Sequence, residues 1–226
     1  MSLTHPHRWV DQQDQLELII DELLTEQRYA IDTEFHRERT YFPTLALVQL
    51  GWGDGQFVLV DPLAVDITAL RRLFESDVQA VFHAAQQDLD VLTHAVGAVP
   101  KEFFDTQIAG GFVGYGTPSL VALLSAEVGV SPPKGDRLTD WLRRPLTDAQ
   151  RDYAAADVAY LLQVQDRLIA KLDELGRVSW AEQACRELRE KPTSGLNPNE
   201  SWKRLKDVRG LRPRPRAVAQ ALTAWR

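Results

Sequence analysis

Three apolar segments near the N-terminus constrain the fold of this chain most strongly. Residues 29–35, 45–51 and 56–61 are short and rich in aliphatic and aromatic side chains, and the letters WGDG separate the second from the third. Such segments joined by turn residues predict β-strands that pair as an antiparallel meander. The rest of the chain has mainly helical patterns. We therefore expect an α/β fold in which a mixed sheet is flanked by helices.

The remaining elements follow from periodicity and helix-start signals. Helices are expected at 13–24, at 84–96 after a short strand at 79–83, and from Asp105, Ser119, Thr147 and Ser179 onward. Thr147 and Gln150 have the spacing of a capping box, which defines where that helix begins and therefore its register.

The length and composition predict one main domain with a small appendage. The chain has 226 residues, and 44% of them are hydrophobic, which is enough for one sizeable core. Pro, Gly, Ser and Asn cluster at 191–200, where the charge also changes sign. We expect a main domain over 1–192 and a separate segment over 193–226.

The charge is distributed unevenly. The net charge of −6 argues against binding a polyanion through an overall basic surface. From Leu196 to Arg226, however, eight basic residues face two acidic ones, so this segment carries +6 and the first 195 residues carry −12. An acidic body with a basic tail suits a carboxylate-rich metal site plus an extension that contacts a polyanion. A solvated surface explains such charge runs equally well.

Cysteine usage and hydropathy indicate the compartment. Cys185 is the single cysteine, so there is no disulfide framework and no set of cysteines at zinc spacing. No apolar run approaches the roughly 20 residues that a membrane-spanning helix needs. We expect a cytoplasmic protein that does not associate with a membrane.

Asp32 and Glu34 are two residues apart in the first predicted strand. Side chains alternate along a strand, so both carboxylates point to the same face. Two adjacent carboxylates repel each other unless a cation neutralises them, and Mg²⁺ prefers oxygen ligands. The alternative is that the pair lies at an exposed strand end.

The predicted helix at 84–96 carries another acidic candidate. Its apolar stripe consists of Ala85, Leu89, Leu92 and Val96. On a helical wheel Asp88 lies roughly 70° from the centre of that stripe and can reach the rim of the core, whereas Asp90 lies roughly 130° away and is expected to be solvated. His83, just before the helix, is expected to pack or to contact substrate, because Mg²⁺ sites seldom use imidazole.

The helix from Thr147 shows the sharpest signal. Asp157 lies in the middle of an apolar face whose other members are Tyr153, Tyr160, Leu161, Val164 and Leu168. Burying a lone carboxylate is costly, so Asp157 requires a metal ion or an arginine partner. Tyr153 precedes Asp157 by one helical turn and lies over the same site, unless it is only a core aromatic.

These residues resemble the tyrosine-bearing branch of the DEDD superfamily of 3′-5′ exonucleases, and within it the bacterial ribonuclease D family. The similarity covers residues 29–162 and is carried by the segments AIDTEFHRERTYFPTLALVQLG, LVDPL, VFHAAQQDLDVL, FFDTQIA, RLTDWLRRPLT and YAAADVAYLL. The resemblance implies a ribonuclease H-like fold. It also implies hydrolysis of RNA at single-stranded 3′ ends, with tRNA precursors and other stable RNA as substrates and nucleoside 5′-monophosphates as products.

The resemblance also implies roles for individual residues. Asp32, Glu34 and Asp157 would hold one divalent ion, and Asp32 with Asp88 a second, both Mg²⁺ or Mn²⁺. Two ions about 3.5–4 Å apart activate a hydroxide and stabilise the departing 3′-oxygen. Tyr153 has an ordinary pKa near 10, so we expect it to orient the attacking water rather than to deprotonate it.

Further expectations concern the substrate and the C-terminus. Thr33, Phe35 and His83 are candidates to line the pocket for the last nucleotide. Lys134, Arg137, Arg143 and Arg144 surround Trp141 in a mixture that could grip a single strand, with structural packing of Trp141 as the alternative. Residues 201–226 resemble the lead-in and first helix of an HRDC domain, so we expect an incomplete, basic helical segment. A monomer is the default.

Two other functions are compatible with this pattern. One is a DNA-directed 3′-5′ exonuclease of the same superfamily, and the other is a noncatalytic RNA-binding scaffold. A comparison of RNA with DNA of one sequence separates the first from an exoribonuclease. RNA binding without metal-dependent cleavage would identify the second.

Overall fold

The computed structural model describes residues 6–37, 40, 42–53, 55–131, 139–191 and 198–225. Contacts divide the chain into two compact units, Met1–Arg189 and Glu190–Arg226. The second unit contains η4 (Pro198–Arg204), η5 (Val208–Gly210) and α9 (Pro213–Trp225). The assignment of 193–226 to an HRDC-like domain stays a prediction.

The first unit is built on a mixed sheet. Its strands are β1 (Arg8–Val10), β2 (Arg28–His36), β3 (Thr44–Trp52), β4 (Gln56–Val60), β5 (Gln79–Phe82) and β6 (Phe103–Asp105), in the spatial order β1-β4-β3-β2-β5-β6. β2, β3 and β4 pair antiparallel, which confirms the predicted meander, whereas β1, β5 and β6 add on in parallel. The three-residue strands β1 and β6 were not predicted, because so few residues show no periodicity.

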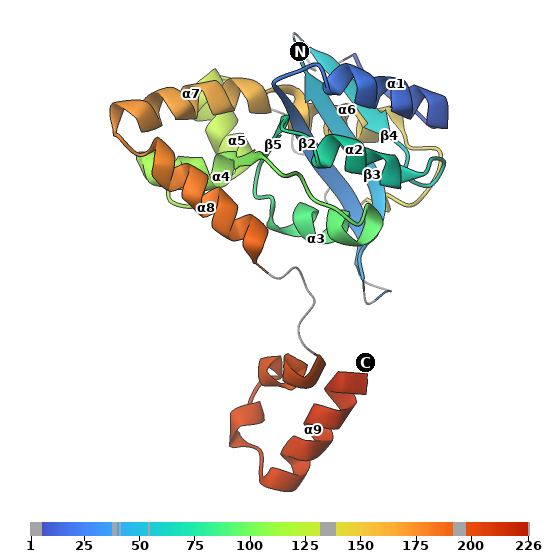
Figure 1. Cartoon of the computed structure of the whole chain (residues 1–226), viewed down its shortest axis with the longest axis vertical. Helices are drawn as coiled ribbons and strands as arrows, with labels where there is room; N and C mark the ends of the chain where they lie inside the picture. The colour runs from blue at the N-terminus through green and yellow to red at the C-terminus, as the bar shows by residue number, and fades with distance from the viewer. Residues whose placement is uncertain are drawn as a thin grey trace. The chain divides into compact units, whose positions relative to one another are not determined.

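Helices cover both faces of this sheet. They are α1 (Gln13–Leu23), η1 (Ile67–Leu70), α2 (Arg71–Phe74), α3 (Gln86–Ala95), α4 (Thr106–Gly110), η2 (Gly111–Tyr115), α5 (Leu120–Leu123), η3 (Leu124–Val128), α6 (Asp148–Ala159), α7 (Leu161–Glu174) and α8 (Val178–Glu190). In Figure 1, α1 and α2 lie across one face, and α4, α5, α7 and α8 gather at the end of the sheet that carries β5.

The alternation of side chains along the strands creates two cores. Tyr29, Ile31, Val48 and Leu50 pack with α1, α2 and α3 on one face. On the opposite face Ala30 and Val81 pack with α4, α5 and α7, while Leu47 and Leu59 pack beneath α6. This arrangement confirms the expected α/β fold. It also puts the face of β2 that carries Ala30 below α6.

The start of α6 is determined both locally and by a buried ion pair. The Thr147 side chain accepts from the Gln150 backbone N–H and the Gln150 side chain accepts from the Thr147 N–H, so the predicted capping box is confirmed. Just before it, Arg144 donates to both oxygens of Asp61 at 2.7 and 2.6 Å and to the Ala46 carbonyl at 2.7 Å. These bonds tie the segment that leads into α6 to the ends of β3 and β4.

Breaking this pair is expected to destabilise the first unit. In an Asp61→Asn variant the Arg144 guanidinium loses its counter-charge in a largely buried site, which we expect to cost about 3 kcal/mol of unfolding free energy. Urea titration followed by circular dichroism measures this cost. The matched control is Asp77→Asn, which breaks the exposed pair with Lys101. Its cost is expected to stay below about 1 kcal/mol. Equal losses of unfolding free energy in the two variants would contradict a special stabilising role for the buried pair of Asp61 and Arg144.

Two predictions about helices were wrong. The single helical face drawn through Tyr160 is interrupted, because that residue has φ −120° and ψ 3° and separates α6 from α7. Asp90 is not solvated: it is 7% exposed, forms an ion pair with Arg37 and lies 3.7 Å from the His94 ring nitrogen. A helical wheel considers only the helix itself, whereas here the residue that follows β2 covers Asp90.

Within the described residues no single helix is long and apolar enough to cross a bilayer. The segments Thr106–Tyr115 and Leu120–Val128 reach that length and composition only together, with a bend of 56° between them.

Candidate metal centre

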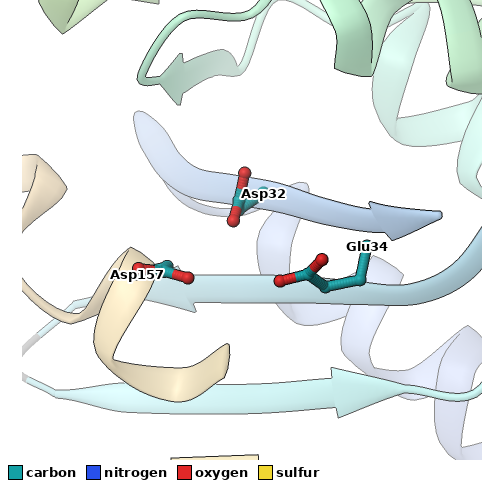
Figure 2. A group of neighbouring side chains, drawn as sticks. All are labelled: Asp32, Glu34 and Asp157. Carbon is teal, nitrogen blue, oxygen red and sulfur yellow. The ribbon is translucent and has the colours of Figure 1, made fainter. Parts of the chain in front are cut away.

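Three of the predicted carboxylates converge on one point. Asp32 and Glu34 project from the same face of β2, and Asp157 projects from the last turn of α6 above that face. Each offers a carboxylate oxygen, and these oxygens lie within 4.8 Å of one another. Figure 2 shows Glu34 and Asp157 turned toward each other with Asp32 beside them. Oxygen ligands from two elements around one small space suit a divalent cation.

The electrostatics of the group agree with this interpretation. Burial, followed by the charges of Asp32, Asp157 and Asp88, raises the pKa of Glu34 to about 9. Burial raises the pKa of Asp32 to about 6, against the hydrogen bond from the Thr33 backbone. Within the part of the chain that the structure describes, neither Asp32 nor Glu34 forms an ion pair with Lys or Arg. A carboxylate group of this kind fits a bound cation.

Asp88 lies beside this group on α3 but outside the set of oxygens within 4.8 Å. It is 6% exposed, and its Oδ1 accepts a hydrogen bond from the Thr33 hydroxyl at 2.5 Å. Burial and the neighbouring charge of Asp32 raise the pKa of Asp88 well above its usual range. Thr33 lies between Asp32 and Glu34 in β2, and its hydroxyl holds the Asp88 carboxylate close enough for the charge of Asp32 to act on it.

Tyr153 is half-buried on α6, one turn before Asp157. Its ring stacks on Trp141, with ring centroids 6.1 Å apart and planes inclined by 30°. The stacking fixes the ring beside the carboxylate-bearing end of α6. The role of its hydroxyl stays a prediction.

The predicted substrate contacts have varied surroundings. Thr33 is buried and bonded to Asp88. Phe35 is half-buried, with the Arg37 guanidinium 5.5 Å from its ring centroid. His83 is half-buried, and its Nδ1 lies 2.9 Å from the Thr106 hydroxyl. Burial lowers the pKa of His83, so the neutral imidazole is favoured.

The proposed basic and aromatic grip around Trp141 is largely structural. Trp141 is buried under α6, and Arg144 is engaged with Asp61, so neither is presented to a single strand. Arg143 is exposed. Lys134 and Arg137 lie outside the described residues.

One residue that the sequence reasoning treated only as a helix start has a larger role. Asp105 is 1% exposed and accepts hydrogen bonds from backbone N–H groups of both α4 and the turn before α3. In the sequence, the signal for this role was an acidic residue directly after Phe103 and Phe104. A carboxylate next to such apolar residues is expected to be buried and to need several hydrogen-bond donors.

Comparison with known proteins agrees with this geometry. Ribonuclease D of Cronobacter turicensis is 37% identical to this chain over 216 residues, which cover 94% of this chain and 58% of that protein. The crystal structure of Escherichia coli RNase D, described as an exoribonuclease involved in structured RNA processing, matches with a TM-score of 0.90 at 31% identity. That match covers 97% of this chain and 59% of the other.

A solved structure of Brucella melitensis NrnC with bound Mg²⁺ also matches, with a TM-score of 0.66 at 27% identity over 84% of this chain and 90% of the other. By contrast, the chain spans somewhat more than half the length of the Cronobacter ribonuclease D. A sequence model of the 3′-5′ exonuclease family matches residues 7–173, which include all four carboxylates and Tyr153. The chain therefore belongs to the 3′-5′ exonuclease family.

Proposed function

We propose that this chain is a metal-dependent 3′-5′ exoribonuclease that removes nucleoside 5′-monophosphates from single-stranded RNA ends. The observation that carries the proposal is the convergence of Asp32, Glu34 and Asp157 within 4.8 Å. Family membership supports phosphodiester hydrolysis, and the ribonuclease D relatives support RNA as the substrate.

Two divalent ions, Mg²⁺ or Mn²⁺, belong to this proposal. Asp32, Glu34 and Asp157 would hold one, and Asp32 with Asp88 the other. When bound, such ions supply an activated water and stabilise the negative charge on the leaving 3′-oxygen. The half-buried carboxylates with raised pKa values fit this role, since a cation compensates the cost of their ionisation.

The other residues bind and orient the substrate in this proposal. The Tyr153 hydroxyl accepts and donates hydrogen bonds and would hold the attacking water in line with the terminal phosphate. Thr33, Phe35 and His83 would line the pocket of the last nucleotide, with a base resting on the half-exposed Phe35 ring. Precursors of tRNA as substrates, a cytoplasmic location and a monomeric state belong to the same proposal and follow from the family resemblance.

A cleavage assay tests the function. Protein is incubated with 5′-labelled RNA that has a single-stranded 3′ tail, in Mg²⁺, Mn²⁺ or EDTA, and DNA of the same sequence is run in parallel. The expected result is a metal-dependent ladder that shortens from the 3′ end, with RNA cleaved faster than DNA. Faster cleavage of DNA would support a DNA-directed exonuclease. RNA that stays intact with every metal although it is bound would support a noncatalytic scaffold.

The Tyr153 hydroxyl is expected to matter for turnover but not for folding. A Tyr153→Phe variant keeps the ring that stacks on Trp141 and removes only the hydroxyl, so kcat should fall about 10²-fold with little change in KM. Single-turnover rates on the same RNA measure the loss. Tyr160→Phe is the matched control, because Tyr160 lies after the last turn of α6. A similar decrease in both variants would argue against a specific role for Tyr153.

A further inference from the structure

We propose that Asp105 is a positioning residue for Asp88, acting through a backbone clamp on the turn that begins α3. The inference rests on the proposed two-ion function, since it concerns how one of its carboxylates is held. Asp105 itself is buried behind that turn and is not proposed as a metal ligand.

The clamp consists of four backbone donors on one carboxylate. Oδ2 of Asp105 accepts from the Ala85 N–H at 2.9 Å, and Oδ1 accepts from the Ala84 N–H at 3.1 Å. The same Oδ1 accepts from the N–H groups of Gln107 and Ile108 at 2.8 and 3.3 Å. The carboxylate thus joins the turn after β5 to the start of α4 after β6. Several donors satisfy a buried carboxylate without a counter-ion.

The clamped turn has an unfavourable backbone conformation. Ala84 has φ 61°, in the left-handed region that residues with a Cβ seldom adopt. Such a conformation persists only where the surroundings impose it, and it concentrates at functional sites. Asp105 supplies the restraint, because its two oxygens hold the N–H groups on both sides of the Ala84 Cα.

A second contact supports the same turn. The Thr106 hydroxyl donates to the Phe82 carbonyl at 3.0 Å. The His83 Nδ1 lies 2.9 Å from the same hydroxyl. The pair Asp105-Thr106 therefore fixes the chain from Phe82 at the end of β5 to Ala85, the residue before α3 begins.

The position of Asp88 follows from this restraint. Asp88 lies in the first turn of α3, only two residues after the helix begins at Gln86. Any rotation of the turn at Ala84 would rotate the start of α3. It would also move the Asp88 carboxylate away from the Thr33 hydroxyl, from which it accepts a hydrogen bond at 2.5 Å. Asp88 is thus placed from two sides, by β2 directly and by Asp105 through the backbone.

An Asp105→Asn variant isolates the contact. The amide oxygen can still accept from Gln107 and Ile108 and so cap α4, but an NH₂ group then faces the Ala85 N–H, and two donors repel. We expect the affinity for the ion that depends on Asp88 to fall about 10- to 100-fold. Titration with Mn²⁺ alone, with free Mn²⁺ followed by electron paramagnetic resonance, measures affinity and stoichiometry. Asp88→Asn gives the reference for complete loss of that ion.

Ala84→Gly provides a rescue. Glycine adopts a positive φ without a steric penalty, so the turn no longer depends on the clamp. In the Asp105→Asn background, Ala84→Gly should raise the Mn²⁺ affinity at least tenfold above that of Asp105→Asn alone. Asp66→Asn is the matched control, because the Asp66 side chain likewise accepts from a helix-start N–H, that of Thr68, but on the surface and away from the site. Its Mn²⁺ binding should equal that of the unmodified protein.

The outcomes separate this inference from the proposed function. An unmodified protein that neither binds Mn²⁺ nor shortens RNA would overturn the proposed function. Normal Mn²⁺ binding by a folded Asp105→Asn variant would overturn only the positioning role. If Asp105→Asn does not fold, the double variant is decisive: a folded double variant that binds Mn²⁺ no better than Asp88→Asn would also overturn it.

Discussion

Replacing Asp32 with asparagine is expected to abolish exonuclease activity, with kcat lowered at least about 10³-fold, or about 4 kcal/mol of transition-state stabilisation. The reason is its central place among the acids. After burial, the charge of Asp32 is the next cause that raises the pKa of both Glu34 and Asp88, so Asp32 borders both proposed ion sites. Removing the Asp32 charge should therefore weaken the binding of both ions, whereas Glu34→Gln or Asp88→Asn should weaken the binding of only one.

The same substitution should leave the fold intact. Asp32→Asn removes a charge that repels Glu34, so the thermal midpoint in EDTA should stay equal or rise while activity disappears. Opposite effects on stability and activity are characteristic of a site built for function. The control is Asp148→Asn on the same helix as Asp157, where the carboxylate is 96% exposed, and it should change neither quantity. Retention of more than a tenth of the activity in Asp32→Asn would contradict the central role.

Removal of the metal is expected to make the stability of the protein depend on pH with a defined sign. Glu34 has a pKa of about 9 in the fold against 4.5 ordinarily, and Asp32 about 6 against 3.8. An acid whose pKa is raised by folding binds more protons in the folded than in the unfolded state between the two values. The contribution of these two acids to the stability of the fold is thus fully present below about pH 4 and is lost as pH rises through 6 and toward 9.

A bound divalent ion should reverse this loss. The ion binds the ionised carboxylates, so its effect is small at pH 5 and largest near pH 9. At a concentration 100 times the dissociation constant, binding stabilises by about 2.7 kcal/mol, which corresponds to a rise of about 5–10 °C in the thermal midpoint. Differential scanning fluorimetry at pH 5, 7 and 9, in EDTA and in Mg²⁺, measures the difference between the two curves.

The difference between the curves is specific to the site, because acids elsewhere titrate alike with and without the ion. Glu34→Gln should flatten the EDTA curve and reduce the Mg²⁺ effect, whereas Asp77→Asn, on the surface beside Lys101, should leave both unchanged. An Mg²⁺ effect that is absent at pH 9, or equal at pH 5 and pH 9, would contradict metal binding by these carboxylates.

Local patterns predicted most of the scaffold. The strand alternation that puts Asp32 and Glu34 on one face, the meander of β2, β3 and β4, and the capping box at Thr147 are all confirmed. Each depends on residues close in sequence, where backbone geometry alone relates side chains to one another.

Non-local contacts explain the errors. The wheel placed Asp90 in solvent, but Arg37, which follows a strand more than fifty residues earlier, pairs with it. For the basic segment before α6 the sequence left a grip on a single strand and structural packing of Trp141 both open, and the structure shows packing, with Arg144 held by Asp61 at the end of β4. The break at Tyr160 separates two helices that one periodic pattern had joined, since α6 packs on β3 and β4 while α7 packs beside β5.

The sequence by itself predicted which residues are candidates for the chemistry and determined which element holds each of them, because strand and helix periodicity are properties of neighbouring residues. Only the tertiary structure decided that Asp157 lies within 4.8 Å of Asp32 and Glu34, and that Asp105 holds the turn before Asp88. Those distances depend on how α6 crosses the sheet and how β6 lies beside β5. Core packing and buried polar contacts between distant segments set both arrangements, and no local pattern encodes them.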